Sequence, residues 1–333
     1  MNRHQVLRAF AGAIAGGLMA TLGAVAHAQG KPAGDGGTVR IMINPAGTMG
    51  IGPAVIRKYG FDKKHGINLE VVSYSDQKTA TAAIQSGSAE IVVFDWLAAA
   101  RLRASGTPIV GIAPFLTYVN SVVVPKDSPL KTLADLKGKR VGVAHKTGFD
   151  WIVMQAAAQK LYRMDIGKDA EVREGAIPLL RGLIEKGDLD ATQMWNSLTP
   201  EMLASGRYRT LVTIRELTQQ MGLPTVPFLL FSMREDYAKQ HPGNARAFVA
   251  AYQDAVQVLM KDEDVWTEHG ARLKLSPESL AFFKEQVRRD LLRQFAPDMT
   301  RGLEATLEAV NAVAPEVVGL KTLPAGFLTL DYQ

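Results

Sequence analysis

Polar and aromatic side chains follow directly after several short apolar segments that are typical of β-strands. In an open parallel sheet, ligands bind beyond the carboxyl ends of the strands, so these positions are the first candidates for binding chemistry. In the first part of the chain they are Asn44, Pro45, Gly47, Thr48, Tyr74, Ser75, Asp76, Asp95 and Trp96. In the second part they are His145, Lys146, Thr147, Gly148, Phe149, Trp195 and Asn196, with Thr225 ahead of a later strand. Aromatic faces beside hydrogen-bonding groups suit a small, flat or amphiphilic solute.

Several of these candidates also have a purely structural interpretation. Trp96 and Trp195 can be core residues, and Asp76 and Asp95 can be helix caps. Lys146 is either a solvated charge or, if desolvated in a cleft, a partner for an anion or a nucleophile toward an activated carbonyl.

Recognisable catalytic groupings do not occur in the sequence. There is no G-x-S-x-G elbow, no H-E-x-x-H motif and no phosphate-binding P-loop, and the chain contains no cysteine. The histidines His65, His145, His241 and His269 are far apart, and we expect all but His145 at the surface. The sequence therefore predicts a protein that is not an enzyme and holds neither a metal nor a cofactor.

The first 28 residues have the pattern of a cleavable export signal. Arg3 and Arg8 supply the positive start, residues 9–25 are uncharged, and Ala26-His27-Ala28 fits a signal peptidase site. An uncleaved membrane anchor is the alternative, but the stretch is rich in Gly and Ala and shorter than the ~20 strongly apolar residues of a span. We predict a periplasmic protein with no stable membrane insertion after cleavage.

Composition limits the classes of partner. The absence of cysteine excludes disulfides and a lipid-bearing cysteine at the cleavage point. The formal charge of +5 falls to +3 without Arg3 and Arg8, and no basic cluster suits a nucleic acid backbone. A chain of 333 residues is too long for one lobe of the commonest size. We expect two domains in a freely diffusing monomer.

A weak internal repeat at a spacing of one hundred residues links the two halves. Ile84–Ile91 and Ile184–Ala191 share a helix end at a glycine, Gly87 or Gly187, an acidic residue three positions later and the start of a strand. A glycine suits the left-handed conformation that ends many helices. Coincidence between two generic βαβ units is the alternative explanation, and either one predicts two α/β lobes.

Strands and helices alternate along most of the chain. We predict strands at 39–43, 67–71, 90–94 and 228–232, after a flexible linker at 29–37 that is rich in Gly, Lys and Pro. Long amphipathic helices follow the last strand. Ser276-Pro277 should open one of them and Thr300 should cap another.

Four segments resemble the periplasmic substrate-binding proteins of the nitrate, taurine and alkanesulfonate class of ABC importers, a group that includes thiamine-precursor binders. They are Gly60–Val71, Ala83–Ile91, Leu133–Val143 and Leu183–Ala191. The resemblance implies an α/β type II periplasmic-binding fold, with two doubly wound lobes, two crossings and a ligand cleft between the lobes. Lobe 1 would contain 38–124 plus 227–333, and lobe 2 would contain 125–226.

The resemblance implies a solute receptor that delivers a small organic molecule to an ABC importer permease. The family's tryptophan at the end of a second-lobe strand is matched by Trp195, but residues 196–200 replace the usual acidic-proline continuation. A sulfonate binder should also show more cationic or hydroxyl donors than the carboxylates Asp76, Asp95 and Asp150. The alternative is a binder of a planar aromatic cofactor or precursor, such as a thiamine pyrimidine or pyrroloquinoline quinone, with Lys146 as a contact. A lysine-dependent enzyme is a further alternative.

Overall fold

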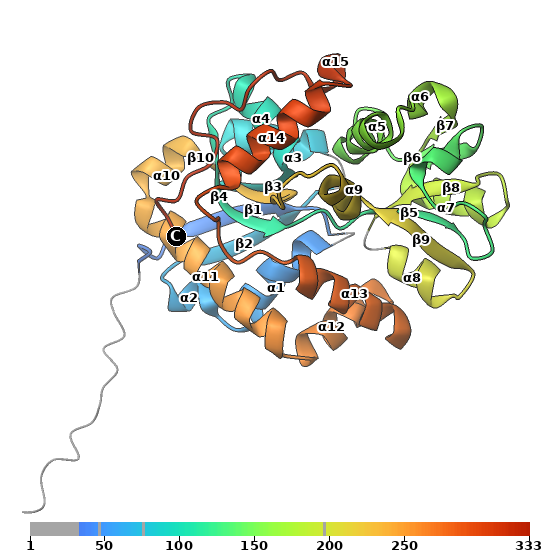
Figure 1. The fold of residues 1–333 in the computed structure, drawn as a ribbon. Coiled ribbons are helices and arrows are strands. Elements are labelled where there is room, and N and C mark those ends of the chain that lie inside the picture. Colours follow the sequence, from blue (N-terminus) through green and yellow to red (C-terminus); the bar gives the residue numbers. More distant parts are fainter. Residues whose placement is uncertain (1–32, 46–47, 75–76, 196–197) are drawn as a thin grey trace, which may run out of the picture. The chain divides into compact units, whose positions relative to one another are not determined.

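The computed structural model describes residues 33–45, 48–74, 77–195 and 198–333. The predicted signal peptide lies outside this part of the chain, as do Gly47, Ser75, Asp76 and Asn196 among the expected site residues. The described residues form two five-stranded mixed sheets flanked by helices (Figure 1). The prediction of two α/β lobes is confirmed.

The two sheets have the same topology. The first contains β1 (Thr38–Ile43), β2 (Asn68–Ser73), β3 (Ile91–Asp95), β4 (Ile109–Leu116) and β10 (Leu229–Arg234), in the order β2-β1-β3-β10-β4. The second contains β5 (Ser121–Pro125), β6 (Arg140–Val143), β7 (Glu171–Glu174), β8 (Ala191–Met194) and β9 (Tyr208–Thr213), in the order β7-β6-β8-β5-β9. In each sheet the fourth strand, β10 or β5, runs antiparallel to both neighbours. Each of these strands is reached only after the chain has crossed from the other sheet.

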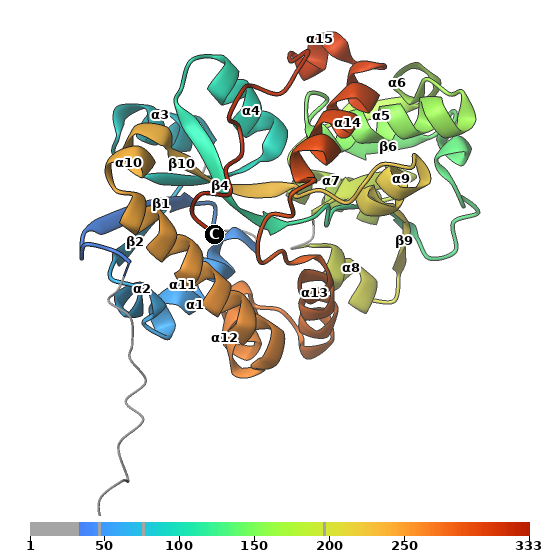
Figure 2. The ribbon, with the colours of Figure 1, turned by 60° about the vertical axis from the view of Figure 1, so that its left-hand side comes forward.

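The helices fall into two groups that follow the sheets. The first sheet is accompanied by α1 (Ile51–Lys58), α2 (Phe61–Lys64), α3 (Gln77–Ser86), α4 (Trp96–Ala104), α10 (Glu235–Gln240), α11 (Pro242–Lys261), α12 (Asp264–Leu273), α13 (Pro277–Asp290), α14 (Met299–Asn311) and α15 (Pro315–Val318). The second is accompanied by α5 (Phe149–Tyr162), α6 (Ile166–Asp169), α7 (Ile177–Glu185), α8 (Thr199–Ala204) and α9 (Ile214–Gln220). The short 3-10 turns are η1 (Thr48–Gly50) and η2 (Leu133–Leu136). From the first group, α13 also packs against α8 (Figure 2), and α14 packs against α5.

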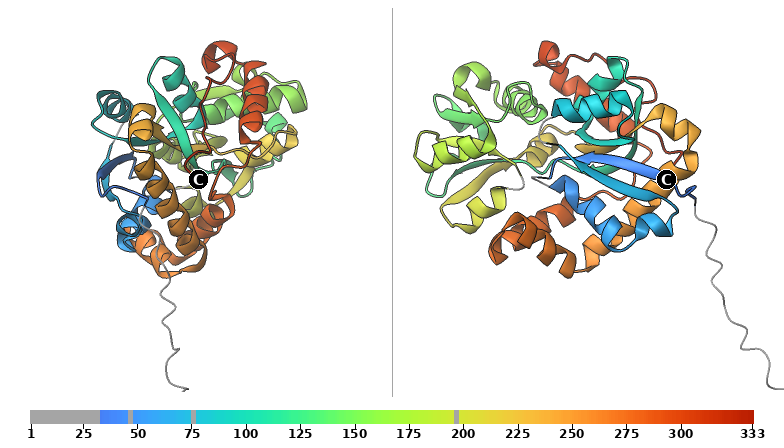
Figure 3. Two further views of the ribbon diagram at one scale, coloured as in Figure 1. Left: turned by 90° about the vertical axis from the view of Figure 1, so that its left-hand side faces the viewer. Right: turned by 180° about the vertical axis from the view of Figure 1, so that it is seen from behind.

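Alternation of side chains along the strands builds a core on each face of the first sheet. In β1, Val39 and Ile41 are buried in one cluster, together with Val55 of α1 and Phe248 of α11. Met42, on the other face, belongs to a second cluster that includes apolar residues of α3, α4 and α14. Helices lie on both faces of the first sheet (Figure 3). The second cluster also contains much of α5, so it extends into the second sheet's group. This alternation is the expected pattern for strands covered on both faces.

The internal repeat is visible as two equivalent ion pairs. Arg40 Nη2 donates to Glu90 Oε1 at 2.5 Å, and Arg140 Nη2 donates to Asp190 Oδ1 at 2.7 Å. In both pairs the arginine backbone N–H also donates to the same carboxylate, at 2.7 and 2.8 Å. Arg40 lies in β1 and Arg140 opens β6, and each of these strands pairs with the strand that follows the acidic partner. The acidic residue three positions after each repeat glycine therefore fastens two parallel strands.

Both repeat glycines adopt the left-handed conformation. The φ angle is 77° at Gly87 and 78° at Gly187. A side chain at Gly87 would also collide with Arg234, whose Nη1 lies 2.3 Å from the position of an added Cβ. The prediction that a left-handed glycine ends these helices is confirmed.

Some local predictions are corrected by the structure. His269 is buried, not exposed: its ring stacks on Phe283 at a centroid distance of 5.5 Å, and burial lowers its pKa to about 3. Helix α14 starts at Met299 with Asp298 as its N-cap, so Thr300 lies inside the helix. Ser276 caps α13 as predicted, by accepting a hydrogen bond from the Ser279 N–H.

The segment predicted as a flexible linker is anchored where it is described. The backbone N–H groups of Gly34 and Gly36 donate to the carbonyls of His65 and Gly66, at 3.0 and 2.7 Å. The Asp35 N–H donates to the Asn244 side chain of α11. These contacts attach residues 34–36 to the first sheet's group ahead of β1.

Removing each repeat arginine should affect stability unequally. The Glu90 side chain is only 4% exposed, so Arg40→Met would leave a buried carboxylate without its cation, at a cost of about 2 kcal/mol in free energy of unfolding. The Asp190 side chain is 31% exposed and water can replace Arg140, so Arg140→Met should cost clearly less. Urea denaturation of both variants measures the difference. Equal losses of free energy of unfolding in the two variants would contradict the idea that burial of the carboxylate sets the cost.

Candidate functional site

Residues that follow strands in both sheets meet at one junction between the two groups of elements. Trp96 directly follows β3, and Phe149 lies beyond β6 at the start of α5. Their rings contact edge to face, with centroids 5.2 Å apart, and both side chains are buried. The Trp96 Nε1–H donates to the Tyr118 hydroxyl at 3.2 Å. The structure thus brings together one predicted site residue from each half of the chain.

Two further aromatic residues of the junction come from the segments in which the chain crosses between the sheets. Tyr118 lies in residues 117–120, which join β4 to β5, and stacks on Phe149 at 5.3 Å. Phe228 lies just before β10, and its ring is 5.6 Å from Tyr118 and 6.1 Å from Phe149. We call Trp96, Tyr118, Phe149 and Phe228 the junction cluster. The sequence analysis missed Tyr118 and Phe228 because it considered residues after the parallel strands and, from the crossings, only Thr225.

Hydrogen bonds fix the crossings against each other. The Phe228 N–H donates to the Leu116 carbonyl at 2.7 Å, and the Phe228 carbonyl accepts from the Trp96 N–H at 2.9 Å. The Ile214 N–H, at the start of α9, donates to the Asn120 carbonyl at 3.0 Å. The crossings are therefore adjacent and mutually paired.

A buried carboxylate, Asp150, lies beside the junction cluster in the first turn of α5. Asn120 Nδ2 and Gln193 Nε2 both donate to its Oδ2, at 2.6 and 2.8 Å. Its Oδ1 has no hydrogen-bond partner among the described residues, and the residue is only 6% exposed. Burial raises the pKa of Asp150 to about 6, the two amides oppose that rise, and the charge of Asp95 adds to it.

Asp95 ends β3 and caps α4. Its Oδ1 accepts a hydrogen bond from the Ala98 N–H at 2.8 Å, so the helix-cap interpretation is confirmed. Burial raises the pKa of Asp95, and the Ala98 hydrogen bond partly opposes that rise. Asp95 and Asp150 place two carboxylates at the junction, one from each sheet's group.

The remaining described candidates of the first half surround the end of β1. Tyr74 is buried, its hydroxyl donates to the Val93 carbonyl at 3.4 Å, and burial raises its pKa to about 12. Thr48 is buried in η1, Asn44 is half-buried and Pro45 is exposed. The Pro45 carbonyl accepts a hydrogen bond from Arg272 of α12, so a C-terminal helix supports this loop.

The candidates of the second half are mostly exposed, apart from Phe149. His145, Lys146 and Thr147 are exposed, and Gly148 is the half-buried N-cap residue of α5. His145 pairs with Glu174, with Nδ1 and Oε1 3.8 Å apart. The solvated interpretation of Lys146 therefore describes this structure.

The last two described candidates lie outside the buried cluster. Trp195 is 39% exposed, in contrast to the fully buried Trp96. Thr225 is also exposed. A ligand role for these residues stays a prediction.

An interaction that the sequence analysis did not anticipate fastens both crossings to α13. Asp290 is fully buried and accepts a hydrogen bond from the Thr117 hydroxyl at 3.1 Å, while its carbonyl accepts from the Thr117 N–H. Arg215 of α9 donates to the same carboxylate, as does Arg289 from α13 itself. Asp290 thus connects the first crossing, α9 and the C-terminal helices.

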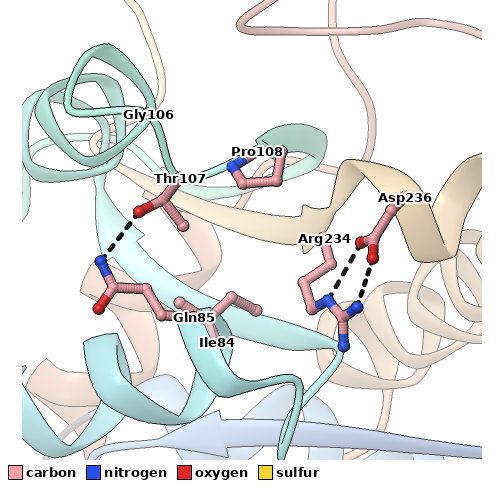
Figure 4. Close-up of a pocket in the computed structure, with 7 residues that line it drawn as sticks. All are labelled: Ile84, Gln85, Gly106, Thr107, Pro108, Arg234 and Asp236. Carbon is pink, nitrogen blue, oxygen red and sulfur yellow. Dashed lines mark hydrogen bonds and ion pairs between the residues drawn. The ribbon is translucent and has the colours of Figure 1, made fainter.

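A shallow hollow elsewhere on the first sheet's group does not overlap the junction. Its lining residues are Ile84, Gln85, Gly106, Thr107, Pro108, Arg234 and Asp236 (Figure 4). Arg234 is paired with Asp236, and its backbone N–H donates to Glu90, ahead of β3. The hollow therefore lies at the end of β3 opposite to Asp95.

The described part of the chain offers no membrane span and no metal centre. None of its helices combines the length and the apolar character needed to cross a bilayer. Within the same residues, no three His, Asp or Glu side chains are grouped so that they could hold a metal ion.

Comparison with known proteins shows the family. The model described as NMT1/THI5 like matches residues 51–264, more than half of the chain. The chain belongs to this family. The taurine-binding periplasmic protein of Escherichia coli (strain K12) is 25% identical over 209 residues, which cover 62% of this chain and 62% of that protein. The 4-amino-5-hydroxymethyl-2-methylpyrimidine phosphate synthase of Schizosaccharomyces pombe is 21% identical over 209 residues, or 61% of this chain and 60% of the relative.

The chain matches less than two thirds of the length of either relative, whereas the structural match is nearly complete. The alkanesulfonate-binding protein SsuA from Xanthomonas axonopodis pv. citri, bound to MOPS, has a TM-score of 0.71 and 16% identity, covering 90% of this chain and 99% of that chain. The predicted family resemblance and the type II periplasmic-binding fold are confirmed.

Protonation of Asp150 should make stability depend on pH. An ordinary aspartate titrates near pH 4, and a folded-state pKa of about 6 means that the native state binds the proton more tightly than the unfolded chain. This group therefore lowers the free energy of unfolding by about 3 kcal/mol as the pH rises from about 4 to above 6. Asp150→Asn should remove this contribution of Asp150 to the pH dependence of the free energy of unfolding.

Denaturation of the wild type and Asp150→Asn across this pH range measures the effect. The variant should gain stability relative to the wild type as the pH rises, and the two should converge near pH 4. Titrating groups that do not interact with Asp150 cancel in the difference. A difference that stays constant with pH would show that Asp150 titrates normally.

Proposed function

We propose that this protein is a periplasmic receptor that captures a small organic solute between its two lobes and delivers it to an ABC importer. The observation that carries the proposal is the junction itself, where aromatic rings and carboxylates from both sheets converge at two paired crossings. The fold shared with an alkanesulfonate-binding protein and the similarity to a taurine-binding periplasmic protein support the same role.

The crossings supply a hinge for capture and release. In a two-lobe receptor, a few residues in the connecting segments absorb the rotation between open and closed forms. Here the connecting segments are 117–120 and the stretch from α9 to β10, and Asp290 holds both near α13. Opening would separate Trp96 from Phe149 and expose the junction cluster to a solute. Closure would then bury the solute's apolar faces between the rings.

We infer a binding role and not catalysis for this chain. Lys146, the residue on which a lysine-dependent reaction would rest, is exposed in this structure. A reactive lysine needs desolvation or a neighbouring cation to lower its pKa. The similarity to a pyrimidine phosphate synthase makes an assay for turnover worthwhile. Among the described residues of the junction, however, no nucleophile is hydrogen-bonded to a general base.

A planar aromatic solute is the second candidate ligand. The junction cluster consists of four aromatic side chains, which would stack on a flat ring. The name of the Schizosaccharomyces pombe relative includes an aminopyrimidine. A thiamine pyrimidine therefore belongs in any ligand screen beside taurine and alkanesulfonates.

Solute binding should be detectable on the purified chain. Native mass spectrometry would reveal a co-purified small molecule, and a ligand at one hundred times its Kd should stabilise the protein by about 2.7 kcal/mol. Intrinsic fluorescence should change as well, because Trp96 lies at the junction. Absence of any bound mass and of any stabilisation by sulfonates, nitrate, pyrimidines or quinone cofactors would contradict a receptor role.

Breaking the Asp290 connection should favour the open form. Arg215→Met removes the contact between α9 and α13, and we expect about fivefold weaker solute binding and a larger radius of gyration in X-ray scattering. Arg289→Met is the matched control, because Arg289 pairs with the same carboxylate from the same helix and its removal leaves the contact between α9 and α13 in place. Equal effects of the two substitutions would argue against a hinge role for Arg215.

A further inference from the structure

Only one of the two carboxylate oxygens of Asp150 is hydrogen-bonded, and this suggests a ligand contact. One carboxylate oxygen accepts two hydrogen bonds and the other accepts none among the described residues, although the side chain is buried. Buried polar atoms are almost always hydrogen-bonded, and leaving one unpaired costs about 1–3 kcal/mol. A bound solute that donates a hydrogen bond to this oxygen would remove that cost.

The surrounding amides hold the carboxylate in one orientation. Gln193 Oε1 accepts a hydrogen bond from the Ala144 N–H at 3.2 Å, which directs the Gln193 amino group toward Asp150. Asn120 donates to the same oxygen from the first crossing. Three separate segments, a crossing, the end of β8 and the start of α5, thus converge on Oδ2, whereas Oδ1 has no hydrogen-bond partner among the described residues.

The charges around Asp150 exclude an anionic group at this point. No salt bridge to Asp150 occurs among the described residues, and the charge of Asp95, another carboxylate, helps to raise its pKa. Tyr118, the other titratable neighbour, lies close enough to both carboxylates to be influenced by their charges. A sulfonate or nitrate placed here would be repelled, whereas an N–H donor would complete the carboxylate's hydrogen bonding.

We propose that Asp150 Oδ1 accepts a hydrogen bond from a nitrogen-bound hydrogen of the solute, and that this solute is therefore an amine or an aminoheterocycle. The inference rests on the proposed function as a receptor and adds the chemical class of its ligand. An aliphatic ammonium and a ring amino group share this donor chemistry. Any acidic group on the solute would bind elsewhere in the cleft.

Calorimetric titration with two matched pairs of probes tests the proposal. Taurine is compared with isethionate, which has a hydroxyl in place of the ammonium group. The compound 4-amino-5-hydroxymethyl-2-methylpyrimidine is compared with the analogue that lacks the 4-amino group. We expect at least one amino-bearing probe to bind, and to bind tenfold or more tightly than its partner. The pair that shows this difference tells an aliphatic amine from an aminoheterocycle.

The variant Asp150→Asn sharpens the test because it replaces the accepting Oδ1 with an amide, at similar volume. It should weaken binding of the amino-bearing probe at least tenfold and abolish the preference within the pair. Asp127→Asn, which removes an exposed charge from the same group of elements, should leave affinity unchanged. A melting temperature at neutral pH no lower than that of the wild type would show that Asp150→Asn is folded.

The outcomes separate this inference from the proposed function. Equal binding within both pairs, or undiminished binding by Asp150→Asn, would overturn the role of Asp150 and leave a receptor of another specificity. Binding of none of the four probes would overturn the amine class. If native mass spectrometry also found no small molecule on the protein, the receptor function itself would fall.

Discussion

The site depends on one topological constraint, the exchange of an antiparallel strand between the two halves of the chain. β10 pairs with β3 and β4 in the first sheet, but the chain reaches it only after completing the second sheet. β5, which directly follows β4, pairs with β8 and β9 in the second. The chain must therefore cross twice at the same end of the sheets. These crossings bring Tyr118 and Phe228 to the ends of the parallel strands, where Trp96 and Phe149 already lie.

The two halves share local features but differ in the burial of equivalent residues. Both have an arginine and an acidic residue that fasten two parallel strands, and both have a left-handed glycine at the preceding helix end. Their tryptophans, however, differ in burial: Trp96 is fully buried within the junction cluster, whereas Trp195 is 39% exposed. The C-terminal helices add to the asymmetry, since α13 and α14 extend from the first group onto the second.

The electrostatics of the junction distinguish it from a simple anion site. A helix start favours negative charge, and Asp150 occupies the first turn of α5. A carboxylate of the protein therefore takes a position where the helix could otherwise have bound an acidic ligand group. Burial near Asp95 raises the energy of the charged form, and the amides of Asn120 and Gln193 offset only part of that cost. This balance underlies the proposed preference of the junction for hydrogen-bond donors.

Local patterns were enough to predict the α/β class, the two lobes and the paired glycines, because alternation and helix-end chemistry depend on neighbours in the sequence. They were also enough to place Asp95 at the end of a strand and Phe149 in the segment that follows another strand, and family motifs indicated the fold. They could not show that Asp290 would connect two crossings, that His269 would be buried against Phe283, or that Asp150 would keep one oxygen unpaired. Asp150 and Asp290 accept hydrogen bonds from residues 30 to 173 positions away in the sequence, and the packing of α12 against α13 determines the burial of His269. The sequence by itself determined which elements form and which residues follow them. The tertiary structure decided which of those residues are buried away from solvent, because burial depends on contacts between segments far apart in the sequence.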